Sequence, residues 1–227
     1  MSRLKKPPSV SALLRLLDKR WPAATTELTH RDPWQLLVAT ILSAQCTDAR
    51  VNLVTPGFFK RWPAIADVAS ARLPDIQKEI HSTGFYRNKA KSIQGAARRV
   101  LEAHAGRVPR TMAEMLEIPG VARKTANVVL GTAFGIAEGV VVDTHIHRLS
   151  RRLGLTKEDR PEKIEQDLMR LVPKARWILF GHQLVLHGRH VCQAKKPLCP
   201  DCSLRPLCPS AQLFLHKPDP KPGDEKK

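Results

Sequence analysis

Lys124 is the residue best placed for covalent chemistry, and it directly follows a sharp turn between two predicted helices. In LEIPGVARKTANVVL, an apolar helical pattern stops at the Pro-Gly pair and resumes at once in a new phase. Backbone N–H groups at a helix start lack intrahelical partners, and the helix dipole adds positive potential there. We therefore expect a phosphate to bind this turn, which consists of Pro119, Gly120, Val121 and Ala122.

Two interpretations are open for Lys124 and for Asp143, which follows in VVVDTHIHR. The helix dipole and partial burial both lower the pKa of an ammonium group, which would give Lys124 a neutral amine able to attack carbon. The alternative is one more surface lysine in a chain with 38 Lys and Arg. Asp143 is either a catalytic carboxylate or the N-cap of a helix that begins at Thr144.

The composition indicates a polyanionic partner. The formal net charge is +17, with a pI near 10.2. No segment has the amphipathic, aromatic-anchored character of a membrane-surface helix, so nucleic acid is expected rather than a membrane. The N-terminal MSRLKKPPSV lacks the apolar region of a secretory signal. We expect an intracellular monomer in the reducing cytoplasm, associated with the nucleoid.

Four of the five cysteines crowd into one short loop with the spacing C-x6-C-x2-C-x5-C. An odd count with this clustering indicates a metal site rather than a disulfide framework. The spacing alone leaves open a tetrahedral zinc ion and an iron–sulfur cluster. The ligands in either case are Cys192, Cys199, Cys202 and Cys208, whereas Cys46 stands alone and is expected to be a buried small apolar residue.

Several basic stretches are candidates for a DNA-facing surface. Lys195 and Lys196 lie inside the cysteine loop, so a bound metal group would hold them ready for phosphate contact. Residues 87–110 carry seven Lys or Arg against one acid, which is either a DNA-binding face or a solvated helix face. On the helix from Thr144, one polar face is formed by His145, Arg148 and Arg152.

The elements that must position these residues are helical almost throughout, which predicts an all-α protein. Helices are expected over residues 9–20, from Asp32-Pro33 to Leu42, and from Asn88 to Ala103. Further segments are expected to open at Thr47, Thr55, Arg72, Thr144, Pro161 and Pro173. Only Gly139 to Val142 resembles a strand, and it has no partner for a sheet. The terminal PDPKPGDEKK has a composition that cannot bury a core.

The stretches LEIPGVARKTANVVL and VVVDTHIHR resemble the helix-hairpin-helix and catalytic-aspartate signature of base-excision DNA glycosylases, specifically the endonuclease III family. The resemblance runs from about residue 9 to residue 210. It implies two helical lobes with a DNA-binding cleft and a [4Fe-4S] cluster on the loop 192–208. The implied domains are 26–136, with the hairpin at about 112–134, then 1–25 plus 137–210, and finally a flexible tail, 211–227.

The same resemblance implies roles for individual residues. Lys124 becomes the nucleophile that attacks C1′ of a flipped nucleotide, and Asp143 assists it. Gln45 enters the space left by the flipped base, and Phe85 takes the wedge position, although taken alone a solvated glutamine and a core phenylalanine are the plainer readings. Phe85, where the family carries an aliphatic residue, is a departure from the pattern. So are Ala122, where a glycine is usual, and His147, where an apolar residue is usual.

Three functions follow as alternatives. The first is a bifunctional enzyme that removes oxidised or damaged pyrimidines from double-stranded DNA and nicks the strand 3′ to the abasic site by β-elimination through a lysine imine. The second is a monofunctional glycosylase of the adenine mismatch type, which lacks an amine at the position of Lys124. The third is a non-catalytic DNA-binding module with a zinc site, which would require neither Lys124 nor Asp143.

Overall fold

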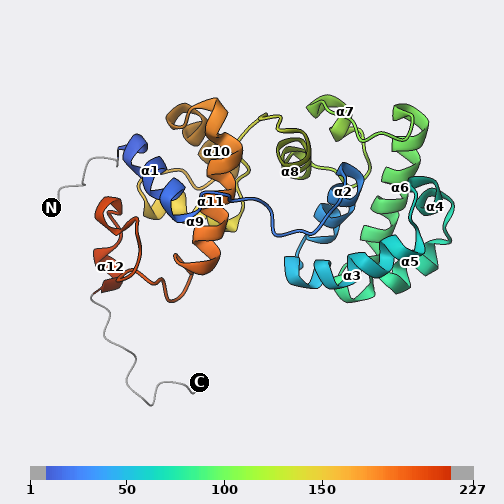
Figure 1. The fold of residues 1–227 in the computed structure, drawn as a ribbon, viewed down its shortest axis with the longest axis horizontal. Coiled ribbons are helices and arrows are strands. Elements are labelled where there is room, and N and C mark those ends of the chain that lie inside the picture. The colour runs from blue at the N-terminus through green and yellow to red at the C-terminus, as the bar shows by residue number, and fades with distance from the viewer. Residues whose placement is uncertain (1–8, 216–227) are drawn as a thin grey trace, which may run out of the picture. The chain divides into compact units, whose positions relative to one another are not determined.

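The computed structural model describes residues 9–215, and within that range the chain is all-helical, with no strand (Figure 1). The predicted all-α class is therefore confirmed. None of the helices in the described range is long and apolar enough to cross a membrane. Most of the predicted tail, residues 216–227, lies outside the described residues. Its first part differs from the prediction, because Ala211 is buried and Gln212–Leu215 form a short helix.

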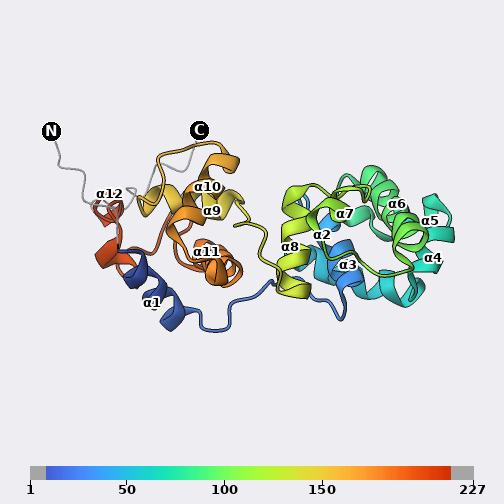
Figure 2. The ribbon, with the colours of Figure 1, turned by 90° about the horizontal axis from the view of Figure 1, so that it is seen from above.

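The chain forms two compact units, one of which interrupts the other in sequence (Figure 2). Thr25–Val141 is the hairpin unit, and the chain before and after it forms the cysteine unit. The helices of the hairpin unit are α2 (Pro33–Leu42), α3 (Asp48–Arg61), α4 (Ile65–Ser70), α5 (Leu73–Glu79), η1 (His81–Thr83), α6 (Tyr86–His104), α7 (Met112–Leu116) and α8 (Arg123–Phe134). The segment 137–141 joins this unit rather than the other, and within it Val140 is buried.

Helix α2 is the centre of the hairpin unit. Eight of its ten residues are buried, and it packs against α3, α6 and α8. It begins where the sequence predicts: Asp32 caps it by accepting a hydrogen bond from Gln35 N at 2.8 Å, and Pro33 occupies its first position. A helix that is apolar all round is buried all round, so α2 fixes the elements around it.

The predicted break at Thr55 is wrong. Helix α3 runs without interruption from Asp48 to Arg61 and contains Pro56. Thr55 and Phe58 are both buried on its inner face. Packing of that face therefore outweighs the hydrogen bond that a proline removes inside a helix. Helix α6 begins at Tyr86, two residues before the predicted start.

The cysteine unit joins the first helix of the chain to its last. Its helices are α1 (Val10–Arg20), α9 (Thr144–Arg152), α10 (Pro161–Leu171), η2 (Lys174–Arg176), α11 (Trp177–His190), η3 (Arg205–Leu207) and α12 (Gln212–Leu215). Helix α11 packs against both α1 and α9. Asp18 of α1 forms an ion pair with Arg176, and its Oδ1 accepts a hydrogen bond from Gln183 Nε2 at 2.9 Å.

Candidate functional site

The predicted turn exists as a helix-hairpin-helix, formed by α7, the turn and α8. Val121 N donates to Ile118 O at 3.0 Å, and Gly120 adopts a left-handed φ of +81°. Ala122 is the N-cap of α8, with an extended φ of −93° and no side-chain capping bond. The alanine therefore carries no left-handed strain, since the positive φ falls on Gly120. No cap side chain accepts a hydrogen bond from the N–H groups in the first turn of α8. An anion could bind these N–H groups.

The hairpin is held against α6 by close packing at two glycines. A Cβ placed on Gly95 would lie 3.0 Å from Pro119 Cβ. A Cβ placed on Gly120 would lie only 2.4 Å from Ser92 Cβ. Any side chain at Gly120 must therefore displace α6 or the hairpin. Gly120 therefore serves packing, and access for a phosphate stays a prediction.

Lys124 is the second residue of α8, two residues after the N-cap Ala122. Its side chain is exposed, so the partial burial expected for it is not found. The expected role of Lys124 as a nucleophile would therefore depend on its access and position rather than on burial, and it stays a prediction.

Asp143 is the N-cap of α9, as one of its two interpretations predicts. Its Oδ1 accepts hydrogen bonds from His145 N at 2.9 Å and from Ile146 N at 2.8 Å. The side chain is half-buried. Both bonds use the same oxygen, so the cap fixes the carboxylate without engaging Oδ2 in either bond. A structural cap and a chemical role are thus compatible at this residue.

Gln45 and Phe85 share an unusual backbone conformation. Among the described residues, only Gln45, Phe85 and Ala105 combine a side chain with a positive φ, and the values at the first two are 52° and 47°. Gln45 is exposed, and Phe85 is 62% exposed, which rules out the core reading of Phe85. Left-handed strain in a side-chain-bearing residue is found mostly at functional sites. We name the segments 43–47 and 84–85 the Gln45 turn and the Phe85 turn.

Lys89 is a functional candidate that the sequence did not reveal. It was counted among the basic residues of 87–110, yet it is only 5% exposed. Its Nζ donates to Leu42 O at 2.7 Å and to Thr83 O at 2.8 Å. Burial lowers the pKa of Lys89, and the neighbouring Cys46 acts in the opposite direction. Cys46 is half-buried against the core, which fits its predicted small apolar role only in part.

The rest of the basic stretch divides between internal and external roles. Arg98 Nε donates to Ala69 O at 3.1 Å, and Arg99 forms an ion pair with Glu117. Arg87, Lys91 and Arg107 are exposed. Part of the charge of this stretch therefore fixes α6 to its neighbours, and a DNA-facing role for the exposed part stays a prediction.

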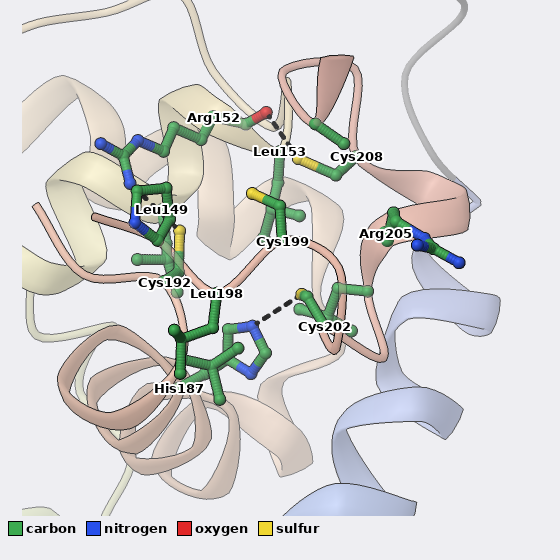
Figure 3. Close-up of a pocket in the computed structure, with 14 residues that line it drawn as sticks. Leu149, Arg152, Leu153, His187, Cys192, Leu198, Cys199, Cys202, Arg205 and Cys208 are labelled. Carbon is green, nitrogen blue, oxygen red and sulfur yellow. Dashed lines mark hydrogen bonds between the residues drawn. The ribbon is translucent and has the colours of Figure 1, made fainter. Parts of the chain in front are cut away.

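The four clustered cysteines line one pocket in the cysteine unit (Figure 3). Among the described residues, no group of three or more His, Cys, Asp or Glu has the arrangement of a metal site. Burial raises the pKa of the thiols of Cys199, Cys202 and Cys208. The four thiols share this pocket, and whether they hold zinc or an iron–sulfur cluster stays a prediction.

Hydrogen bonds to the cysteine sulfurs come from outside the loop. Arg152 Nη1 lies 3.3 Å from Cys192 Sγ, and His187 Nε2 lies 3.4 Å from Cys202 Sγ (Figure 3). Trp21 Nε1, which can only donate, lies 3.4 Å from His187 Nδ1, so Nδ1 accepts and the proton of the neutral ring sits on Nε2. Burial lowers the pKa of His187 to about 4, which keeps the ring neutral. His187 therefore donates to the sulfur.

The polar face predicted on α9 is directed mainly into its own unit. Arg148 Nη2 donates to Gly188 O at 2.9 Å and to Cys192 O at 3.0 Å. His145 is half-buried beside Gly188. The donors of Arg148 thus hold the start of the cysteine loop, and a DNA contact from His145 or Arg148 stays a prediction.

His147 and the two lysines of the cysteine loop are the remaining predicted residues of this unit. His147 Nε2 lies 2.9 Å from Asp159 O, so this departure from the family pattern is directed to the loop after α9. Lys195 and Lys196 are both exposed, as phosphate contact would require.

Comparison with known proteins agrees with this arrangement. Residues 38–174 match the HhH-GPD superfamily base excision DNA repair protein family. The chain is 56% identical to endonuclease III of Synechocystis sp. over 91% of this chain and 94% of the relative. It is 38% identical to that of Escherichia coli over 90% and 96%.

Solved structures of relatives have the same fold. A non-covalent endonuclease III–DNA complex aligns with a TM-score of 0.86 and 41% identity, over 92% of this chain and 97% of the other. A trapped endonuclease III–DNA covalent intermediate aligns with a TM-score of 0.85 and 40% identity, over 91% and 97%. The chain therefore belongs to the HhH-GPD superfamily of base excision DNA repair proteins, and within it to the endonuclease III family.

Proposed function

We propose that this protein is a bifunctional DNA glycosylase and abasic-site lyase that acts on damaged pyrimidines in double-stranded DNA. The observation that carries the proposal is the exposed Lys124 in the first turn of the helix that follows an uncapped hairpin. A phosphate on the hairpin amides would hold the DNA backbone beside the Lys124 amine. The related structures include an endonuclease III–DNA complex and a trapped covalent intermediate, which supports a covalent step on DNA.

The side chains divide the reaction among them. Gln45 and Phe85 fill the gap that a flipped nucleotide leaves in the stack. Lys124 Nζ attacks C1′, the bond from C1′ to the base breaks, and the base departs with the bonding electrons and takes up a proton. Asp143 stabilises the positive charge that develops on the sugar. Opening of the sugar ring gives an imine, loss of the C2′ proton follows, and the bond from C3′ to its oxygen breaks by β-elimination.

We further propose that Cys192, Cys199, Cys202 and Cys208 hold one [4Fe-4S] cluster as thiolates. The donor set, the shared pocket and the donors to sulfur from Arg152 and His187 support this assignment. When bound, such a cluster crosslinks the loop and can exchange electrons. The exposed Lys195 and Lys196 would then be held ready for phosphate contact. Purified protein should contain about four irons and four sulfides, and colourless, zinc-loaded, fully active protein would exclude the cluster.

Borohydride trapping tests the lyase chemistry. Wild-type protein should form a covalent adduct with abasic-site DNA, and Lys124→Gln should abolish it, whereas Lys163→Gln, at an exposed site in the other unit, should trap as wild type does. Undiminished trapping by Lys124→Gln would place the nucleophile elsewhere.

Asp143 and the choice of lesion need separate measurements. Asp143→Asn should lower base release more than DNA binding, because the amide retains a capping oxygen but not the charge. Equal loss of both would reduce Asp143 to a structural cap. A panel of single-lesion duplexes should show release of oxidised pyrimidines, whereas release of adenine without strand cleavage would favour the monofunctional alternative.

A further inference from the structure

One buried ammonium group connects the Gln45 turn and the Phe85 turn. Leu42 is the last residue of α2 and Thr83 the last of η1, and each leads within a few residues into one of the two turns. Lys89 Nζ donates to the carbonyl oxygens of both, at 2.7 Å and 2.8 Å. A single side chain therefore fixes the starting points of two turns that are distant in sequence.

Lysine is an unfavourable residue for this position unless its charge has a specific use. A buried cation loses hydration, and an apolar side chain of equal length would fill the space without that loss. No carboxylate is among the groups that shift the pKa of Lys89, so the charge is not there to form an ion pair. Both acceptors are carbonyl oxygens at helix C-terminal ends, where the dipole favours a cation. What the ammonium adds over an apolar residue is the fixed placement of two carbonyls.

Each of the two tied turns carries a strained, exposed side chain, and the third such residue of the unit, Ala105, lies apart at the end of α6. The φ values of 52° and 47° hold Gln45 and Phe85 in conformations that side-chain-bearing residues adopt only when their surroundings impose them. Phe85 O also accepts hydrogen bonds from Asn88 N and Lys89 N at 3.1 Å, so the first turn of α6 fixes the Phe85 turn as well. Lys89 thus makes hydrogen bonds, through its side chain or its backbone, that restrain both strained turns.

We propose that Lys89 is a positioning residue for damage recognition, which makes Gln45 and Phe85 enter the DNA stack as one rigid pair. Lys89 itself does not contact DNA, because it acts through the Leu42 and Thr83 carbonyls. The proposal rests on the proposed function, since it assigns the two turns to the vacated stack. It predicts that loss of the tie harms insertion and leaves the lysine chemistry intact.

The first test compares two substrates. Lys89→Met keeps the length of the side chain but loses the donors and the charge, and Lys78→Met removes an exposed charge in the same unit as a control. Release of a damaged pyrimidine from duplex DNA under single-turnover conditions should fall by roughly 10- to 100-fold in Lys89→Met, because catalysis is that sensitive to small misplacements. Borohydride trapping on a single-stranded abasic oligonucleotide, where no stack must be filled, should stay unchanged.

The outcomes separate the two proposals. If Lys89→Met loses single-strand trapping along with duplex activity, Lys89 serves the fold as a whole and the positioning role is wrong. If wild-type protein traps neither substrate, the proposed function fails instead. Lys89→Leu, which also removes the donors and the charge, provides the same comparison should Lys89→Met not fold.

A double-mutant cycle tests the coupling directly. Gln45→Ala and Phe85→Ala are combined in the wild-type background and in Lys89→Met, and duplex base release is measured for each. A rigid pair predicts non-additive losses in the wild-type background and additive losses without Lys89. Additive losses in the wild-type background would overturn the proposal without any Lys89 variant.

Discussion

The hairpin, the Gln45 turn and the Phe85 turn belong to the same unit, and all three contain a residue with left-handed backbone. They place that backbone on different residue types. The hairpin places its positive φ on Gly120, whereas the turns place theirs on Gln45 and Phe85. Glycine adopts this conformation at little cost, and a residue with a Cβ costs on the order of 1 kcal/mol. The hairpin therefore has no backbone strain at this point, and the two turns have strain that the fold must support.

Under the proposed function, the difference follows from what each segment would present to DNA. A phosphate is bound by backbone amides, so the hairpin needs no side chain where the backbone turns. A vacated position in the stack must be filled by a side chain, so the other two turns cannot use glycine there.

The largest effect is expected from Gly120→Ala. The new Cβ would combine left-handed strain with a contact of 2.4 Å to Ser92 Cβ, so the hairpin unit should lose on the order of 2–4 kcal/mol in its free energy of unfolding. Urea denaturation, with hydrogen exchange of the α7 and α8 amides, measures this loss. Gly135→Ala, at a left-handed glycine of the same unit with open space around its Cβ, is the matched control and should lose only the backbone strain, about 1–2 kcal/mol. Wild-type stability in Gly120→Ala would mean that the close packing of the hairpin on Ser92 does not require a glycine.

The Gly120 contact also limits what mutations at this residue reveal. A loss of DNA binding in Gly120→Val would report displacement of the hairpin from α6 as well as a blocked phosphate site. Binding must therefore be compared with hydrogen exchange in the same variant.

Phe85→Gly and Phe85→Ala separate strain from function. Both remove the ring, so base release should fall by about tenfold or more in each, since stacking of an aromatic ring on a base contributes about 1–3 kcal/mol. Only Phe85→Gly also relieves the strain of the φ of 47°. Its free energy of unfolding should therefore be up to about 1 kcal/mol higher than that of Phe85→Ala. Equal stability of the two variants in urea would mean that the Phe85 turn is not strained.

Salt dependence distinguishes phosphate contacts from base contacts. Affinity for undamaged duplex should fall steeply with salt, and Lys195→Ala or Lys196→Ala should reduce the log–log slope by up to about one unit. Gln45→Ala should leave that slope unchanged while lesion selectivity falls. A changed slope in Gln45→Ala would assign the Gln45 turn to the backbone rather than to the stack.

The smallest effect is expected from acid, and it concerns the unit that contains neither the hairpin nor the turns. Hydrogen bonds from Arg176 and then Gln183 lower the pKa of Asp18 from its ordinary value of 3.8. The unfolded chain therefore binds this proton more readily, so the contribution is present above pH 3.8 and is lost as the pH falls below it. Because Asp18 is partly exposed, the loss should be below about 1 kcal/mol. Asp18→Asn should remove this part of the acid dependence of stability, and an unchanged profile would contradict it.

Signals that act locally could be predicted from the sequence. The caps at Asp32, Thr47 and Asp143 each bond to an amide two or three residues away, so short patterns contain the whole interaction. The turn at Gly120 was predictable for the same reason. The break at Thr55 was predicted wrongly, because a core contact of α3 overrides the local preference of proline.

The roles of the basic residues could not be predicted in this way. Lys89 is buried because the fold brings Leu42 O to it, and no pattern near residue 89 reports that carbonyl. Arg148 and Arg152 likewise bond to the loop around Cys192, which is far from them in sequence. Charge counts indicate a polyanionic partner for the chain, but they do not tell which cations remain on the surface.

The interruption of one unit by the other determines the order in which the parts can fold on the ribosome. Leu13 and Leu17 of α1 are fully buried. The helix that α1 packs against, α11, begins only at Trp177. At about 5–20 residues per second, α1 waits roughly ten to thirty seconds for that partner to be translated. Thr25–Val141 emerges in the meantime as an unbroken segment and can fold first. Premature termination after this segment would therefore leave a folded hairpin unit attached to a helix with its apolar face uncovered, a target for chaperones.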